Sequence, residues 1–300
     1  MRLANSFHRW TRIVRDLKRN EDRFRQLERN ASAALFSRYP EIAADLPYAT
    51  MLARHEFRVS SQNGEDGIIA FVFSQIGTTD CRFVEFGSGD GRQCNTASLS
   101  VNFGWTGLLM DADAQKVRAA VAHYTQLGLS EAVRVRHCLV TTENINTELR
   151  ESGFLGEIDL LSIDIDGNDY WVWEAIRLVQ ARVVVIEYNA TFGRERAVAI
   201  PYSPDFNRFD AHPSGRYHGA SLKALELLGR IKGYSLVGCN SDGVNAFFVR
   251  SDLLSGRLRA ISSAQAYHEE RKRRRIATSA EQLAAIAHLP LVTIDETGGE

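Results

Sequence analysis

A short apolar segment that runs directly into a glycine-rich turn constrains the fold of this chain most. Residues 82–91 read Arg-Phe-Val-Glu-Phe-Gly-Ser-Gly-Asp-Gly, and a second apolar segment, 106–111, ends in Asp111. Glycines at such a turn let the backbone approach a ligand where a Cβ would stand in the way. A strand, a Gly-x-Gly-x-Gly turn and an acid at the tip of the next strand are typical of an α/β sheet that binds a nucleoside.

The spacing of the glycines and the acids beside them narrow the choice of nucleoside. A dinucleotide turn reads G-x-G-x-x-G, whereas Gly91 comes one residue early here. Glu85 and Asp90 flank the turn and would repel a pyrophosphate, but they suit a ligand with a cationic end, such as the ammonium and sulfonium of S-adenosylmethionine. A nicotinamide-dependent oxidoreductase remains an alternative, which the absence of a Tyr-x-x-x-Lys pair disfavours.

From residue 82 onward, apolar segments alternate with helical patterns. We expect strands over 82–86, 106–111, 133–140, 158–164, 182–188, 233–238 and 244–250, and helices over 94–102, 114–127, 143–152, 169–179 and 219–231. The continuous apolar run 183–186 indicates a strand covered on both faces. The short connection 240–243 predicts a hairpin, so only one of the last two strands can be parallel to the others. We predict an α/β fold with a doubly wound, seven-stranded, mostly parallel sheet and one antiparallel strand at its edge.

Segments outside this core are basic and helical in pattern. We divide the chain into an N-terminal extension (1–60), a core domain (61–255) and a C-terminal extension (256–300). The amphipathic basic helix expected over 1–30 could pack on its own domain, self-associate or contact an acidic membrane surface. A further helix is expected over 264–287; its basic run 271–275 suits a solvated face or an anionic partner. The tail from Thr293 is expected to be disordered.

Composition excludes several classes of protein. The net charge of -1 gives no general attraction to nucleic acid. The four cysteines are widely spaced with no C-x-x-C pair, so neither a zinc site nor a disulfide framework is indicated, and reduced thiols are the simplest interpretation. The N-terminus lacks the apolar core of a signal peptide, and no window is long enough to cross a membrane. We therefore expect a cytoplasmic protein.

Acids close four of the expected strands, at Glu85, Asp111, Asp164 and Glu187. Because the carboxyl ends of parallel strands meet at one edge of a sheet, these side chains should lie close together. Oxygen ligands of this kind are preferred by Mg²⁺. A metal site is therefore one interpretation; in the other, Asp164 contacts the cofactor and the remaining groups form ordinary hydrogen bonds. The candidate metal ligands are Asp164, Asp166, Glu187 and Asn189.

Over about residues 60–250 the chain resembles the FkbM-type family of class I S-adenosylmethionine-dependent methyltransferases. The resemblance rests on 83–91, 160–167 and 185–189, with further similarity over 233–249. It implies O-methyl transfer, often to sugars or secondary metabolites. A Ser-Gln-Asn-Gly-Glu-Asp segment occurs in bacterial relatives and places Gln62 near the cofactor's amino-acid end. Many relatives have glutamate where Asp166 stands here, so the role of this second acid is open. The predicted cofactor-binding residues are Gln62, Glu85, Gly87, Gly89, Asp90, Asp111 and Asp164.

Methyl transfer to a sugar hydroxyl needs alignment and help with proton removal. His218, in a loop before an expected helix, is one candidate base, and Asp166 is the other. The long insertion 191–215 could form a lid or a packed loop, and His137 is expected in the core. We expect an S-adenosylmethionine-dependent O-methyltransferase acting on a glycan or a sugar-containing small molecule. The alternatives are the oxidoreductase and a non-catalytic binding module. Nucleic-acid methylation is disfavoured because no Asn-Pro-Pro-Tyr-type motif is present.

Overall fold

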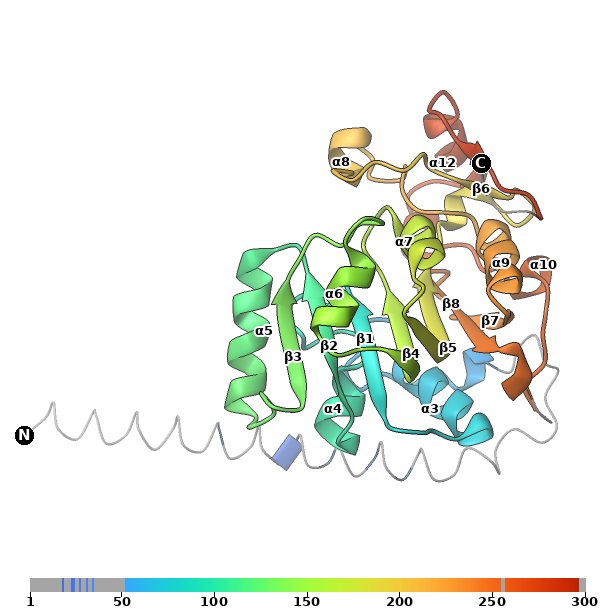
Figure 1. The fold of residues 1–300 in the computed structure, drawn as a ribbon. Coiled ribbons are helices and arrows are strands. Elements are labelled where there is room, and N and C mark those ends of the chain that lie inside the picture. Colours follow the sequence, from blue (N-terminus) through green and yellow to red (C-terminus); the bar gives the residue numbers. More distant parts are fainter. Residues whose placement is uncertain are drawn as a thin grey trace, which may run out of the picture.

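The computed structural model describes residues 52–254 and 257–296, with a few isolated positions between residues 18 and 34. The basic helix predicted over 1–30 and most of the connector after it lie outside the described residues. Figure 1 shows the described part as one sheet flanked by helices, with further short elements at one end of the strands. The site is built at that end.

Seven strands form one sheet in the order β3-β2-β1-β4-β5-β8-β7. All neighbouring pairs are parallel except those of β8, which runs antiparallel to both β5 and β7. The predicted doubly wound, mostly parallel sheet is therefore confirmed. The antiparallel strand lies between β5 and β7, so the outermost strand of that edge is itself parallel to β5. The strands are β1 (Arg82–Phe86), β2 (Thr106–Asp111), β3 (Val133–His137), β4 (Gly156–Ile163), β5 (Val179–Glu187), β7 (Tyr234–Cys239) and β8 (Asn245–Arg250).

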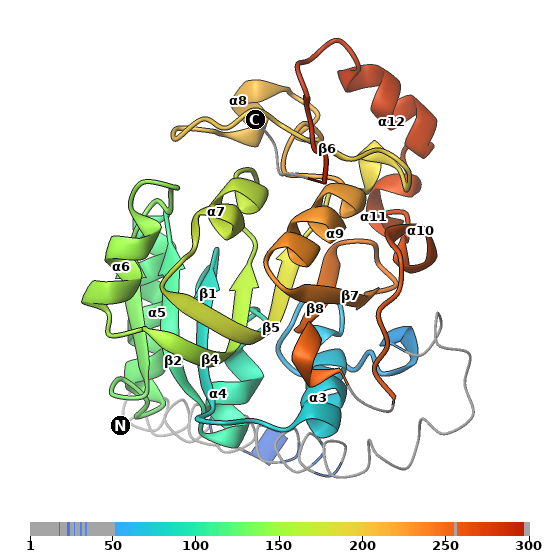
Figure 2. The same ribbon diagram turned by 45° about the vertical axis from the view of Figure 1, so that its right-hand side comes forward.

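Helices cover both faces of the sheet, as Figures 1 and 2 show. The apolar run in β5 explains why: Val183 and Val185 pack into one hydrophobic cluster, whereas Val184 and Ile186 pack into the other. Successive side chains of a strand point to opposite faces, so a continuous apolar run needs cover on both. On one face lie α3 (Glu65–Ile76), α4 (Ala97–Phe103) and α5 (Ala114–Gln126), and on the other α6 (Ile145–Glu151), α7 (Asp169–Ala175) and α9 (Leu222–Ile231).

Two expectations about the C-terminal segment are wrong. In place of one helix over 264–287 there are three: α10 (Ser263–Ala266), α11 (Arg271–Arg274) and α12 (Ser279–Ile286). Ser262 and Thr278 form capping boxes, each of which starts a new helix. The start of the tail is ordered, because β9 (Val292–Thr293) pairs with β6 (Val198–Ala199) and Ile294 is buried beside them; residues 297–300 of the tail lie outside the described residues.

The expectation that His137 lies in the core is also wrong, since its side chain is exposed. It ends β3, the edge strand of the sheet, and its Nε2 lies 2.9 Å from the carbonyl oxygen of Ala112. Arginines alternate with valines along β3, and an edge strand has a neighbour on one side only, so the residue at its end can reach solvent.

The insertion after β5 and the C-terminal segment fold together above the carboxyl ends of the strands (Figure 1). The insertion contains the 3₁₀ turn η1 (Ala190–Phe192), β6 and α8 (Arg208–Ala211). Phe192, Ile200 and Tyr217 share a small apolar cluster with Ile286 of α12. Burial of this cluster fixes residues 257–296 at the edge of the sheet where ligands of open α/β sheets bind.

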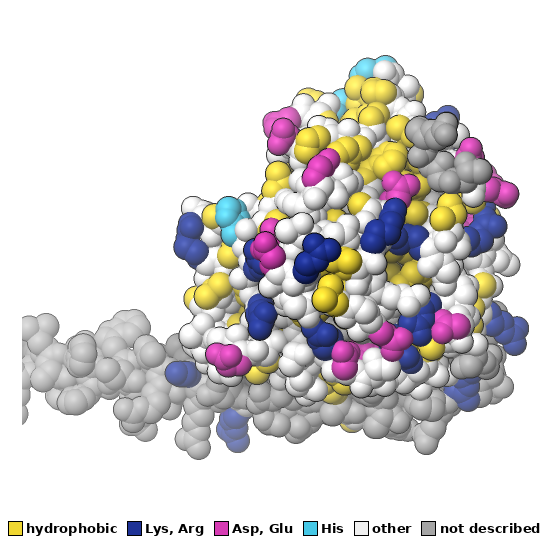
Figure 3. All heavy atoms as spheres, viewed as in Figure 1, with side chains coloured by type: hydrophobic (Ala, Val, Ile, Leu, Met, Phe, Trp, Pro, Cys, Tyr) yellow, Lys and Arg dark blue, Asp and Glu magenta, His cyan; other side chains and the backbone are white. Residues whose placement is uncertain are grey.

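Lys and Arg side chains are interspersed with Asp and Glu side chains over the face in Figure 3. None of the helices within the described residues is long and apolar enough to span a bilayer.

Candidate active site

A cleft of about 950 Å³ opens at the carboxyl ends of the strands. Glu85, Asp111, Asp164 and Glu187, the four acids that close strands, all line it. The prediction that the strands bring these side chains to one edge is therefore confirmed. The volume of the cleft suits a nucleoside-sized ligand together with part of a second molecule.

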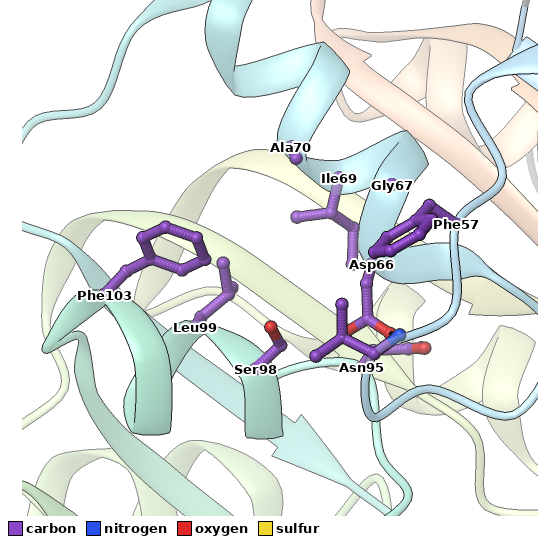
Figure 4. Close-up of a pocket in the computed structure, with 10 residues that line it drawn as sticks. Phe57, Asp66, Gly67, Ile69, Ala70, Asn95, Ser98, Leu99 and Phe103 are labelled. Carbon is purple, nitrogen blue, oxygen red and sulfur yellow. Dashed lines mark hydrogen bonds between the residues drawn. The ribbon is translucent and has the colours of Figure 1, made fainter. Parts of the chain in front are cut away.

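A second, apolar pocket lies between α3 and α4, where Ile69, Leu99 and Phe103 face one another beside Phe57 (Figure 4). Its volume is about 20 Å³, which is close to the space of one water molecule. It is a packing gap of the helical layer and cannot hold a substrate.

The glycine turn after β1 is built for close approach of backbone to backbone. Gly87 has a φ of +73°, and a Cβ built on it would lie 1.6 Å from the carbonyl oxygen of Asp164. The turn is also tied to β2, because the Gly87 N–H donates to the carbonyl oxygen of Met110 at 2.9 Å. Only glycine fits at this position, and its backbone is exposed in the cleft.

Asp111 joins the turn to the tip of β2. Its Oδ2 accepts a hydrogen bond from the Gly89 N–H at 2.7 Å, and its Oδ1 accepts one from the Asp113 N–H at 2.8 Å. Each carboxylate oxygen can accept further hydrogen bonds from a ligand in the cleft. Asp90, also on the cleft, forms an ion pair with Arg92 at 3.0 Å.

Glu85 is buried and fully hydrogen-bonded. Oε1 accepts from the Asn95 N–H at 2.9 Å and from the Ser162 hydroxyl at 3.2 Å, and Oε2 accepts from the N–H and the hydroxyl of Thr96. Burial raises the pKa of this carboxyl, while these donors act in the opposite direction. Glu85 thus holds the start of α4 against β1 and β4, in addition to lining the cleft.

Gln62 reaches the cleft from a loop that Glu65 fastens. The Glu65 carboxylate accepts from the backbone and side chain of Asn63 at 2.8 and 3.1 Å. It also accepts from the side-chain amides of Asn240 and Asn245 in the β7–β8 hairpin, at 2.8 and 2.9 Å. The loop is therefore tied to the β7–β8 hairpin. The exposed side chain of Gln62 lines the same cleft as the glycine turn.

Three carboxylates gather where β4 and β5 end. Ligand oxygens of Asp164, Asp166 and Glu187 all lie within 4.8 Å of one another. Asp166 adopts a φ of +59°, a conformation held by Asp169, whose two oxygens accept from the N–H groups of Ile165 and Gly167 at 2.9 Å. Burial and the neighbouring carboxylates raise the pKa values of Asp164 and Glu187 well above the usual range. Such a group favours a shared proton or a bound cation.

Asn189, predicted as a fourth ligand, is not brought into this group. Its Oδ1 caps η1 by accepting from the Thr191 N–H at 3.0 Å. Its Nδ2 donates to the carbonyl oxygens of Arg216 and His218 at 2.7 and 2.8 Å. The side chain is buried, and these bonds use its amide to brace the loop that carries His218.

His218 lies behind Glu187 and does not overhang the cleft. It is buried, with Nδ1 3.5 Å from Glu187 Oε2 and Nε2 3.1 Å from Nη1 of Arg273. A guanidinium can only donate, so Nε2 must accept and Nδ1 must carry the hydrogen that faces Glu187. Burial, together with Arg273 and Arg208, lowers the pKa of His218 to about 3. The geometry suits a neutral histidine that orients Glu187.

The pH dependence of catalysis tests this assignment. With a pKa near 3, His218 stays neutral above about pH 4, so it contributes no limb near pH 6.5. We expect His218→Ala to lower kcat by about 10–100-fold through misplacement of Glu187. The shape of the pH–rate profile between pH 5 and 9 should not change. A wild-type limb near pH 6.5 that disappears in the variant would restore the general-base role.

The sequence did not identify the cationic residues of the cleft. Arg208, Lys272 and Arg273 all line it, and Arg208 forms an ion pair with Asp166. The basic run 271–275 was visible, but nothing local showed that it folds back over the strands. Phe206 lines the cleft as well, in space that a side chain at Gly167 would occupy. The insertion 191–215 thus forms a packed wall of the site.

Several solved structures show a distant likeness. One is a proposed sarcosine dimethylglycine methyltransferase from Galdieria sulphuraria, at 16% identity and a TM-score of 0.39, covering 55% of this chain and 58% of that one. The chain therefore spans less than two thirds of that protein. A SAM-dependent methyltransferase from Aquifex aeolicus has 15% identity, covers 60% and 88%, and has a TM-score of 0.36. The N-terminal domain of EvdMO1, solved with SAH and D-fucose, has 14% identity, covers 67% and 85%, and has a TM-score of 0.40.

No curated protein matches the chain. The family model of the methyltransferase FkbM domain matches residues 62–226, which is more than half of the chain. The match begins at the Gln62 loop and contains the glycine turn, Asp111 and the three clustered carboxylates. The chain belongs to the FkbM family of methyltransferases.

Proposed function

We propose that this protein transfers a methyl group from S-adenosylmethionine to a hydroxyl group of a glycan or a sugar-containing small molecule. The observation that carries the proposal is the double role of Asp164. Its carbonyl oxygen packs against Gly87 in the glycine turn, and its carboxylate belongs to the acidic cluster. A cofactor at the turn and an acceptor at the cluster would therefore be direct neighbours, as in-line transfer of a methyl group requires.

The charge of the cleft supports a cationic cofactor. An excess of carboxylates favours the ammonium and sulfonium of S-adenosylmethionine and opposes the pyrophosphate of a nicotinamide cofactor. Among the described residues that line the cleft, nine are acidic (Glu65, Glu85, Asp90, Asp111, Asp113, Asp164, Asp166, Glu187 and Glu270) and four are basic (Lys116, Arg208, Lys272 and Arg273).

Substitution of Asp111 tests the cofactor assignment. We expect Asp111→Ala to weaken S-adenosylhomocysteine binding by roughly 1–3 kcal/mol, because hydrogen bonds from the ribose to a charged group are lost. Titration calorimetry measures the change, with NADH as the negative control ligand. Unchanged affinity would remove the ribose contact, and tight NADH binding by the wild type would favour the oxidoreductase.

The clustered carboxylates also fit Mg²⁺, because they are hard oxygen ligands and because burial and neighbouring carboxylates raise the pKa values of Asp164 and Glu187. Asp164, Asp166 and Glu187 would hold the ion, which would supply Lewis acidity toward the acceptor hydroxyl. Without an ion, Asp166 is the candidate proton acceptor, since its side chain is 60% exposed at the cleft. In either case, Arg208 must release Asp166 or share it.

Chelation separates these possibilities. If the cluster works through Mg²⁺, excess EDTA should abolish turnover and added Mg²⁺ should restore it. Calorimetry with Mg²⁺ alone should show binding that is lost in Glu187→Gln. Full activity in EDTA, with no heat of Mg²⁺ binding, would leave the carboxylates as contacts of the cofactor or acceptor.

The function itself is tested by incubating the full chain with S-adenosylmethionine labelled on the methyl group and a panel of mono- and oligosaccharides. We expect the label to appear on a sugar oxygen as a methyl ether. The product should resist mild base, which would hydrolyse a methyl ester. Binding of S-adenosylhomocysteine with no transfer to any sugar would favour the binding module or another class of acceptor.

A further inference from the structure

The short helix α11 separates the cleft from a second hollow of about 420 Å³. Lys272 and Arg273 line the cleft, whereas Arg271 and Arg274 line the second hollow. Residues three apart in a helix share a face, so the basic run presents cations on both sides at once. We call the second hollow the basic hollow; its lining residues are Arg194, Ser241, Tyr267, His268, Glu269, Arg271 and Arg274.

Three guanidinium groups reach this hollow, and each keeps most of its donors available. Arg271 meets Asp242 through one nitrogen at 3.5 Å, and Arg274 meets Glu269 through Nε at 3.2 Å. These arginine side chains are 67% and 70% exposed, so such pairs contribute little and exchange readily. A guanidinium has five N–H donors, and its terminal fork matches a carboxylate or a phosphate.

Arg194 is the third cation. Its Cζ lies 5.6 Å from the ring centroid of Tyr267, and no carboxylate among the described residues pairs with it. Glu269 is the one acidic residue among those that line the basic hollow. The lining therefore has an excess of positive charge, in contrast to the acidic excess of the cleft on the other side of α11.

The floor of the basic hollow is already fixed by hydrogen bonds. The Tyr267 hydroxyl donates to the carbonyl oxygen of Ala190 at 2.7 Å, and the Tyr188 hydroxyl donates to that of His268 at 2.7 Å. The Arg271 N–H donates to the carbonyl oxygen of Asp242 at 3.0 Å, which fastens α11 to the β7–β8 hairpin. A preformed floor lowers the ordering cost of binding a ligand.

We propose that the basic hollow is a subsite for an acidic group, a carboxylate or a phosphate, on a sugar adjacent to the one that is methylated. The proposal rests on the proposed function, because it assigns the acceptor as an acidic glycan. One sugar would occupy the cleft beside the carboxylate cluster, and its neighbour would extend past α11 toward Arg194, Arg271 and Arg274. The guanidinium groups of these arginines would then donate hydrogen bonds to the acidic group. A neutral glycan has no such group to accept them.

Binding to the full chain, measured by titration calorimetry in the presence of S-adenosylhomocysteine, tests this subsite. The probes are tetragalacturonate, maltotetraose as a neutral chain of the same length, and inorganic phosphate. We expect tetragalacturonate or phosphate to bind at least tenfold more tightly than maltotetraose. The double variant R271Q/R274Q should lose at least tenfold in affinity for that anionic probe. Binding of tetragalacturonate assigns a carboxylate, and binding of phosphate alone assigns a phosphate group.

The control variant R150Q/R230Q removes the same charge from exposed arginines of α6 and α9, and it should bind as the wild type does. Equal affinity of wild type and R271Q/R274Q for the anionic probes would overturn the subsite, as would a wild type that does not prefer them to maltotetraose. The proposed function can fail separately. If no sugar is methylated but binding of the anionic probe still requires Arg271 and Arg274, then the hollow binds anions and the assignment of an acidic glycan as acceptor is wrong.

Discussion

Replacing Asp164 with asparagine is expected to lower kcat for methyl transfer by about 10²–10⁴-fold. The substitution removes one titratable carboxylate from the cluster that Asp164 forms with Asp166 and Glu187. Whether the cluster holds a cation or accepts a proton, its charge is what assists ionisation of the acceptor hydroxyl. Asparagine has nearly the same shape and keeps the backbone carbonyl against Gly87, so the cofactor turn should stay intact.

The measurement is a pair of experiments on the same preparation: single-turnover transfer of labelled methyl, and calorimetry with S-adenosylhomocysteine. The rate should fall, while cofactor affinity changes by less than about tenfold. Asp80→Asn is the matched control, because Asp80 precedes β1 at the opposite end of the strand, where its exposed carboxylate contacts only Arg82: it accepts from the Arg82 N–H at 3.2 Å and pairs with the guanidinium at 3.8 Å. A wild-type rate for Asp164→Asn would show that the cluster takes no part in the reaction.

The second large effect is expected from Gly87→Ala. The added Cβ would lie 1.6 Å from the carbonyl oxygen of Asp164, and that neighbour is backbone, which cannot swing away as a side chain would. The φ of +73° adds the strain of a left-handed conformation. Relief requires β1 and β4 to separate where the cofactor and the carboxylate cluster meet. We expect a loss of about 3 kcal/mol or more in the free energy of unfolding, together with loss of cofactor binding.

Gly104→Ala is the control for backbone strain alone. Gly104 has a φ of +70°, but a Cβ there meets no atom within 4 Å. It should therefore cost only about 1–2 kcal/mol and leave cofactor binding unchanged. Denaturant unfolding and calorimetry measure both quantities. If Gly87→Ala is no less stable than Gly104→Ala, the close packing of the turn on the Asp164 backbone is not as the structure describes.

Local patterns predicted the framework because each rests on interactions close in sequence. The alternation of Val183 and Val185 with Val184 and Ile186 between two cores follows from the geometry of a strand, so a run of four apolar residues already implies two helical layers. The glycine turn and Asp111 could be placed together because parallel strands end at one edge. Asp169, which holds the loop of Asp166, was visible in the sequence but not as the residue that shapes the loop.

The sequence could not predict contacts between residues that are far apart along the chain. His218 reads as a loop histidine, and its contact with Arg273, 55 residues later, makes it a buried neutral histidine whose Nδ1 lies 3.5 Å from Glu187. Asn189 reads as a metal ligand until its amide is seen to brace the loop of Arg216 and His218. Such contacts depend on how two distant segments dock, and that depends on summed burial rather than on local preference.

The sequence by itself determined the sheet, its helical cover, the glycine turn and the row of acids at one edge, because strand periodicity and turn chemistry are local. Tertiary structure alone decided which polar groups face the ligand. It turned Glu85 toward the start of α4, placed His218 behind Glu187, and brought the C-terminal cations Lys272 and Arg273 over the cleft. The physical reason is that a side chain's pKa and role follow from its burial and charged neighbours, and these exist only once segments far apart in the sequence have packed together.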